Sequence, residues 1–134
     1  MNILNKLHNP NVGILLIRVA LGAVFIAHGW AKFADMEGTI GFFSSLGMAA
    51  FLAYFVSAAE LVGGILMILG LFVRPVGIIL ASIMAVAILS VKIKMGFLGG
   101  YEYELVLLLI ALSMVFLGGG SYKVWKCCGP ECKC

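Results

Sequence analysis

Charged residues are scarce in this chain: Asp, Glu, Lys and Arg make up 11% of its 134 residues. A typical soluble domain is about 25% charged. Hydrophobic residues account for 63% of the sequence, and so large an apolar surface is stable only against lipid. The composition therefore excludes an ordinary soluble domain. The net charge of +3 is small and unclustered, which argues against a nucleic-acid-binding surface.

Cysteine is absent from the first 126 residues, so this part of the chain has no disulfide framework. It also has no dinucleotide-binding fingerprint and no pair of haem ligands. A secretory signal is not evident, because the first apolar run contains Arg18 and lacks a clean small-x-small cleavage site beyond it. We therefore interpret this run as a retained transmembrane helix.

Long apolar runs are the dominant feature of what is present. A helix needs about 20 mainly apolar residues to cross the hydrocarbon core of a bilayer. Four stretches qualify, at about residues 12–33, 50–73, 75–91 and 101–117. The sequence thus predicts an all-α integral membrane protein, an antiparallel four-helix bundle over residues 1–122 followed by a cysteine-rich tail at 123–134. The connection at 34–49 contains Phe42 and Phe43 and predicts a short interfacial helix.

Four spans place both chain ends on one side of the membrane. The cations expected on that side are Lys6, Arg74, Lys123, Lys126 and Lys133. The cations expected on the opposite side are Lys32, Lys92 and Lys94. Cytoplasmic loops carry an excess of Lys and Arg, so both termini are predicted to be cytoplasmic.

Ionisable residues within the spans are few, and such residues are costly in lipid and usually face the bundle interior. Glu60 lies near the middle of the second span, on a stripe of small residues. On the first span, Arg18 lies on one side of the depth of Glu60 in the membrane and His28 lies on the other. The sequence alone does not decide which of the two is the partner of Glu60. We predict an Arg18–Glu60 ion pair that fixes helix register. The alternative is a proton-handling carboxylate in a ligand pocket.

A polar pocket is predicted at the end of the bundle opposite the termini. His28 and Lys32 are four residues apart and share a helix face. The predicted ligand-binding residues are His28, Lys32, Lys92, Tyr101 and Trp30, and the predicted catalytic carboxylates are Glu60 and Glu104. Acid, base and donors beside apolar walls suit a small amphipathic ligand, such as a quinone head or a sulfur compound. The alternative is that these residues are interfacial anchors, with Lys32 extending to the headgroups.

All four cysteines lie in the last eight residues, as Cys127, Cys128, Cys132 and Cys134. They predict a tetrathiolate site for zinc or another metal, with Gly129-Pro130 making the turn. The spacing has no regular C-x-x-C pair, so redox-active cysteines and a disordered reactive tail stay as alternatives.

The chain resembles the DoxX family from about Ile14 to Tyr122. The matching residues on the first span are Arg18, Gly22, Phe25, His28, Gly29 and Lys32. Those on the second are Ala59-Glu60-Leu61, Gly63-Gly64 and Leu69-Gly70, and Gly100-Tyr101-Glu102-Tyr103 opens the fourth. The resemblance implies a small four-helix membrane protein of a bacterium or archaeon, related to subunits of a thiosulfate:quinone oxidoreductase. The cysteine tail lies outside the family pattern.

Three functions follow as hypotheses. The first is a subunit of a membrane oxidoreductase, homo- or hetero-oligomeric, that passes electrons from a sulfur or thiol donor to quinone. Because the bundle has no cysteine, the electron carrier would be the ligand, the tail or a soluble redox partner. The second is a non-catalytic membrane anchor or assembly factor for a soluble redox or metal-binding partner. The third is a small-solute or proton carrier that uses Glu60.

Overall fold

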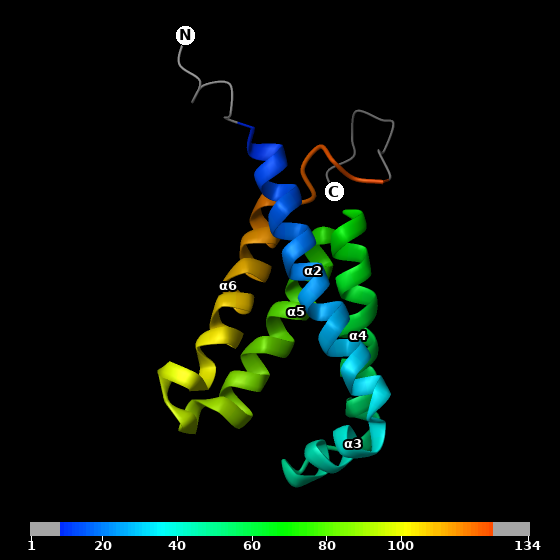
Figure 1. The fold of residues 1–134 in the computed structure, drawn as a ribbon, viewed down its shortest axis with the longest axis vertical. Coiled ribbons are helices and arrows are strands. Elements are labelled where there is room, and N and C mark those ends of the chain that lie inside the picture. Colours follow the sequence, from blue (N-terminus) through cyan, green and yellow to red (C-terminus); the bar gives the residue numbers. More distant parts are fainter. Residues whose placement is uncertain (1–8, 125–134) are drawn as a thin grey trace.

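The computed structural model describes residues 9–124, which form five α-helices and no strand (Figure 1). The helices are α2 (Pro10–Ala34), α3 (Met36–Ser45), α4 (Ala50–Leu69), α5 (Val73–Ala87) and α6 (Glu102–Leu117). Four helical segments are long and apolar enough to cross a membrane: Pro10–Ala34, Ala50–Leu69, Val73–Met95 and Phe97–Leu117. The predicted all-helical membrane bundle, with a short helix after the first span, is confirmed.

The N-terminus of α2 is fixed by Asn9, whose side-chain oxygen accepts hydrogen bonds from the Asn11 and Val12 amides at 3.2 and 3.4 Å. Pro10 occupies the first helical position, where a missing N–H costs nothing. Asn9 is therefore the N-cap of α2, a position that Asn side chains favour.

The C-terminus of α4 differs from the prediction, which extended this helix to residue 73. Gly70 adopts a left-handed conformation with φ of 75°. Its amide bonds to the Met67 carbonyl, and the Leu71 amide bonds to the Leu66 carbonyl. This Schellman arrangement ends the helix at Leu69. The chain then reverses within three residues into α5, which begins at Val73 rather than at Pro75.

The third span loses regular α-helical geometry at its far end. A π-helical turn at Ile88–Lys92 is followed by a 3-10 turn at Ile93–Met95. The chain reverses at Gly96 and Gly99, whose φ angles are 82° and 72°. A second π-helical turn, Phe97–Tyr101, then leads into α6. The unwound ends place Lys92 and the start of α6 next to each other.

The four long helices form two close pairs. In the first pair, a Cβ added to Gly29 of α2 would lie 2.6 Å from the Leu61 backbone nitrogen of α4. A Cβ on Gly64 would lie 2.7 Å from the Gly22 carbonyl oxygen. In the second pair, a Cβ on Gly77 of α5 would lie 2.9 Å from a carbonyl oxygen of α6. Such contacts are possible only where a small residue lets two backbones approach.

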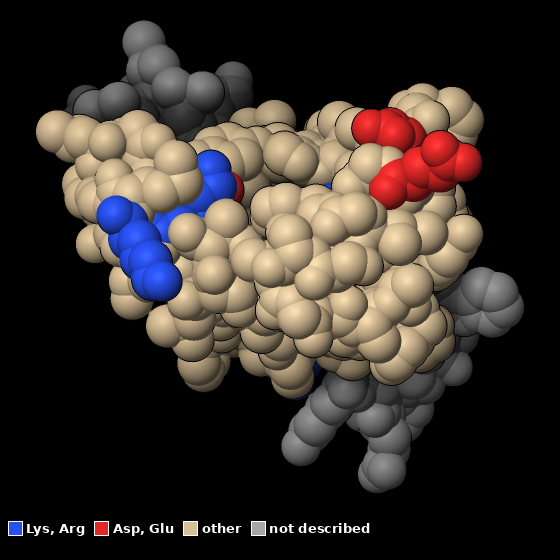
Figure 2. Space-filling model, turned by 90° about the horizontal axis from the view of Figure 1, so that it is seen from below, with Lys and Arg blue, Asp and Glu red and all other residues tan. Residues whose placement is uncertain are grey.

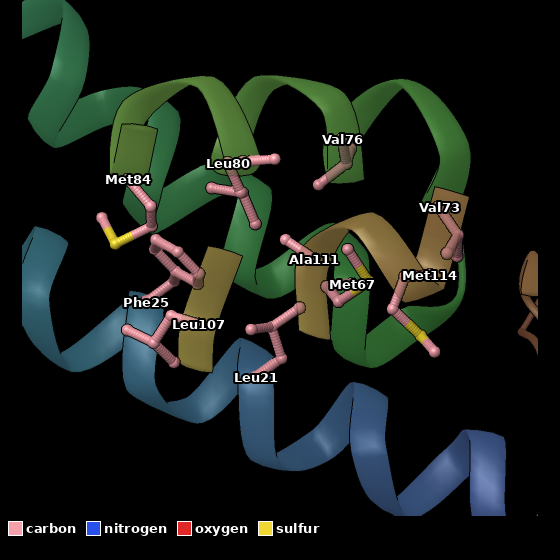
Figure 3. Packing of buried hydrophobic residues seen from close by; sticks show 11 residues of the cluster. Leu21, Phe25, Met67, Val73, Val76, Leu80, Met84, Leu107, Ala111 and Met114 are labelled. Atoms are coloured by element: carbon pink, nitrogen blue, oxygen red, sulfur yellow. The ribbon is translucent and has the colours of Figure 1, made fainter. Parts of the chain in front are cut away.

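The core lies between these pairs and draws side chains from all four long helices (Figure 3). Leu21 and Phe25 of α2 point toward Met67 of α4, Leu80 of α5 and the buried face of α6. By contrast, α3 contributes no buried residue. It lies across the end of the bundle rather than within it (Figure 1).

Arg18 is buried at the opposite end of the bundle, and its guanidinium binds only backbone carbonyls among the described residues. Its donors reach Met67 at 3.0 Å, Ile68 at 2.7 Å and Tyr122 at 2.6 Å, and they also reach Gly119. The predicted Arg18–Glu60 ion pair is therefore wrong. The terminal carbonyls of a helix have no intrahelical partner and carry partial negative charge, so the end of α4 takes this cation instead.

Candidate functional site

A cleft of about 820 Å³ lies at the α3 end of the bundle, between the two helix pairs. All five helices and the Ile88–Lys92 turn contribute to its lining. Seen from this end, basic side chains gather at one side of the face and acidic side chains at the other (Figure 2). The cleft therefore combines a mixed-charge rim with the apolar interior of a helix bundle.

The first polar group in the cleft is an ion pair between Lys32 and Glu60. Lys32 comes from the last turn of α2, and Glu60 comes from the middle of α4. The Glu60 side chain is 1% exposed, whereas that of Lys32 is 27% exposed. Lys32, rather than Arg18 or His28, is thus the counter-charge of Glu60, and it links the carboxylate to the open side of the cleft.

The second polar group is a looser ion pair between Lys92 and Glu104. Lys92 Nζ lies 3.6 Å from Glu104 Oε1. The Glu104 side chain is 16% exposed, and its second oxygen, Oε2, is buried without a hydrogen-bond partner among residues 9–124. A buried polar atom without a partner is costly and is usually satisfied by a ligand, water or ion. Glu104 is therefore the carboxylate at this cleft whose second oxygen has no hydrogen-bond partner in the described part of the chain.

Aromatic side chains complete the polar end in a way that differs from the prediction. The His28 ring packs against Tyr103, with ring centroids 6.0 Å apart and planes at 37°. Tyr101 does not line the cleft and instead packs edge-on against Phe97 at 5.5 Å. Trp30 is 68% exposed and also lies outside the lining. The structure thus brings Tyr103 to the cleft in place of Tyr101 and Trp30.

Tyr103 could have been found from helix phase. It lies four residues before Leu107, which is 6% exposed and belongs to the core. Residues four apart share a helix face, so Tyr103 lies on the cleft side of α6, where it stays 47% exposed, while Tyr101 precedes the start of α6. Of the predicted site residues, the structure brings the following together around the cleft: His28, Lys32, Glu60, Lys92 and Glu104.

Most of the remaining lining is apolar, and the polar residues Asp35, Thr39, Ser82 and Ser90 complete it. The apolar side chains include Phe42 and Phe43 from α3, Leu46 just after it, Leu52, Phe55 and Val56 from α4, and Ile83, Met84 and Val86 from α5. Sequence reasoning placed Phe42 and Phe43 at the membrane interface but did not connect them to the pocket. The cleft as a whole suits a molecule with a polar head and an apolar body.

No set of three His, Cys, Asp or Glu side chains is arranged to hold a metal ion within residues 9–124. The predicted metal ligands Cys127, Cys128, Cys132 and Cys134 all lie outside the described residues. The tail therefore stays a prediction, and the chemistry of the cleft depends on its carboxylates, lysines, imidazole and phenol.

The fold and cleft define an integral membrane protein with four spanning helices and a polar-ended cleft at one membrane face. The chain belongs to the DoxX family, whose pattern it matches over residues 13–93. This range runs from α2 through the third span. The family resemblance seen in the sequence is therefore confirmed.

Three curated proteins illustrate the similarity. The chain is 44% identical over 107 residues to "Putative oxidoreductase CatD" of Bacillus subtilis (strain 168), covering 80% of each protein. It is 28% identical over 72 residues to "Inner membrane protein YqjF" and 32% identical over 68 residues to "Inner membrane protein YphA", both of Escherichia coli (strain K12). These matches cover 54% and 49% of the chain and 55% and 49% of the two E. coli proteins. No solved structure matches the chain.

Proposed function

We propose that this protein is a subunit of a membrane oxidoreductase system and that its cleft binds the quinone that accepts electrons from a sulfur or thiol donor. The observation that carries the proposal is that Glu104 Oε2, beside a largely apolar cleft of about 820 Å³, has no hydrogen-bond partner among residues 9–124. The similarity to a relative named as an oxidoreductase, over 80% of both chains, supports the reaction class.

The residues of the cleft fit both forms of a quinone. The oxidised form has two carbonyl oxygens, and Lys32, Lys92 and the aromatic pair of His28 and Tyr103 offer donors to them. The reduced form has hydroxyl groups, and Glu104 Oε2 is placed to accept from one of them. The ring itself would lie against apolar walls such as Met84 and Leu107.

Electron and proton counts agree with this assignment. Reduction of a quinone to a quinol consumes two electrons and two protons, and oxidation of two thiols to a disulfide releases the same number of each. Of the three carboxylates that line the cleft, Glu60 and Glu104 would carry these protons. Glu104 would exchange one proton at Oε2, and the Lys32–Glu60 pair would exchange the second through the Lys32 ammonium. The lysines also stabilise negative charge that develops on a ligand oxygen.

The test compares Glu104→Gln with Glu102→Gln in purified, membrane-reconstituted protein. Both residues lie in the first turn of α6, but Glu102 accepts a hydrogen bond from the Gly99 amide and does not line the cleft. Loss of a general acid–base group costs about 10²–10⁴-fold in rate. We expect Glu104→Gln to lower the rate of thiol-driven quinone reduction in membranes by at least about 10²-fold. Glu102→Gln should leave this rate near that of the wild type.

Two results would contradict the proposal. One is a wild-type protein that neither copurifies with quinone nor binds it when it is added. The other is a folded Glu104→Gln variant with undiminished quinone binding and turnover. Either result would favour a non-catalytic anchor for a redox partner, in which the polar residues of the cleft only set helix packing.

A further inference from the structure

The cleft has a polar inner end and an apolar outer end, and α4 contributes to both. The ion pairs belong to the inner end, on α2, α4, α6 and the Ile88–Lys92 turn. At the outer end, three large side chains line the cleft and are also exposed: Phe42 of α3 is 48% exposed, Phe55 of α4 is 61% exposed and Val86 of α5 is 50% exposed. A side chain that lines a cleft and is also half exposed marks its mouth.

The mouth lies on the lipid-facing surface of two spanning helices. Residues seven apart lie on the same face of a helix. Phe55 shares its face of α4 with Val62, which is 52% exposed, and Val86 shares its face of α5 with Ile79, which is 46% exposed. Because both helices are apolar spans, these faces contact acyl chains. The opening between α4 and α5 is therefore directed sideways into the bilayer.

The other sides of the cleft differ in how far they are closed. Gly29 brings α2 against the Leu61 backbone of α4 at the level of the cleft. The Gly77 contact between α5 and α6 lies nearer the opposite end of the bundle. Between α2 and α6, the His28 and Tyr103 ring centroids are 6.0 Å apart and Tyr103 is 47% exposed, so this side is partly open. Between α4 and α5, Gly63 meets Leu80 closer to the middle of the bundle. Below that contact the two helices contribute their cleft-lining residues, so the gap widens toward α3.

We propose that the cleft receives its ligand laterally from the membrane, through an opening rimmed by Phe42, Phe55 and Val86, and that the ligand carries an alkyl or isoprenoid chain which occupies this opening. The polar head would reach Glu104 while the chain extends along the apolar walls into the acyl region. The identity of the head as a quinone rests on the proposed function, whereas the lateral opening rests on the cleft itself.

The experiment narrows the mouth and compares two ligands. Val86→Trp places a larger side chain at the rim, and Ile79→Trp places the same side chain on the same face of α5, outside the cleft lining. Full-length wild type and both variants are reconstituted in nanodiscs. Binding is then measured for a naphthoquinone with an isoprenoid side chain and for the same naphthoquinone without it.

We expect Val86→Trp to raise the Kd of the chain-bearing quinone by about tenfold, equivalent to about 1.4 kcal/mol. The chainless quinone should bind Val86→Trp as it binds wild type, because Asp35 and Thr39 also line the cleft and leave it accessible from the water side. Ile79→Trp should bind both ligands as wild type does. Equal binding of the chain-bearing quinone by all three proteins would overturn the lateral opening and leave the proposed function standing.

A second measurement decides the opening without a quinone. Phospholipids with a photoreactive diazirine near the end of an acyl chain are incorporated in the nanodiscs, and the labelled residues are mapped by mass spectrometry. We expect labelling of Leu52 and Ile83 inside the mouth in wild type, and its loss in Val86→Trp but not in Ile79→Trp. A wild-type cleft without acyl-chain labels overturns the lateral opening. A labelled cleft that binds neither quinone overturns the proposed function alone.

Discussion

Glu60 and Glu104 line the same cleft but are held differently, and this difference divides their roles. Glu60 is 1% exposed and contacts Lys32 directly. Glu104 is 16% exposed, is 3.6 Å from its lysine and has one oxygen without a partner in the described part of the chain. A tightly paired carboxylate fixes its cation in place, whereas a half-paired one can accept from a ligand. In the proposed function, Glu60 therefore positions Lys32, and Glu104 would be the carboxylate that contacts the ligand.

The Lys32–Glu60 pair should matter for stability when one partner alone is removed. Lys32→Met leaves the buried Glu60 carboxyl without its cation, and breaking a buried pair in this way costs about 3–5 kcal/mol. Because Lys32 is 27% exposed, we expect a loss near the lower end of this range. The measurement is the free energy of unfolding in detergent micelles by denaturant titration.

The matched control for this prediction is Lys94→Met, since Lys94 is exposed and forms no ion pair with another described residue. The double variant Lys32→Met with Glu60→Gln should recover part of the loss, because it removes the orphaned charge. If Lys32→Met and Lys94→Met unfold with the same free energy, the pair does not contribute to stability.

At the scale of the helices, glycine contacts set the α2–α4 distance. Gly29→Ala would place a Cβ 2.6 Å from the Leu61 nitrogen and 2.9 Å from its Cα. Backbone atoms cannot move aside as a flexible side chain does, so the helices must separate. Overpacking of this kind costs about 1–3 kcal/mol. We expect Gly29→Ala to reduce the free energy of unfolding by this amount, measured in the same micelles.

Gly13→Ala is the control within the same helix, because nothing lies within 4 Å of the Cβ it adds. Helix propensity favours Ala over Gly by about 1 kcal/mol, so this variant should be neutral or more stable. Gly29 is also one turn before Lys32, so Gly29→Ala should weaken ligand binding as well. Equal stability of the two alanine variants would show that α2 and α4 are not in close contact at this level.

The sequence predicts helices well here because span length and apolar composition are local properties. The partner of a side chain depends instead on how each helix is rotated about its axis. It also depends on which backbone carbonyls are free to accept hydrogen bonds, and a pattern of residue types does not show this. Arg18 shows this most clearly, because its partners are carbonyls at the end of α4 and of residues 119 and 122. The depth of each residue in the membrane, counted along its helix, was enough to predict that His28 and Glu104 lie near the same cleft. Depth alone could not show that Tyr103, rather than Tyr101, lines it.

For the whole molecule, the decisive feature is that the cleft and the described chain ends lie at opposite ends of the bundle. The Ser121 amide donates to the Asn11 side chain at 3.1 Å, and the Val124 amide bonds to the Leu69 carbonyl at 3.0 Å. The cleft is at the α3 end. In the proposed function, an electron donor would therefore reach a ligand in the cleft from the α3 side of the membrane.

This arrangement predicts the membrane orientation of the site. The excess of Lys and Arg on the terminal side favours cytoplasmic ends, so the α3 end should face away from the cytoplasm. We expect green fluorescent protein fused to either terminus to fluoresce. Alkaline phosphatase inserted at Gly47, in the connection between α3 and α4 where the surroundings are open, should be active. Termini on different sides would contradict the four-span fold, whereas an inverted pattern would place the cleft and its electron donor in the cytoplasm.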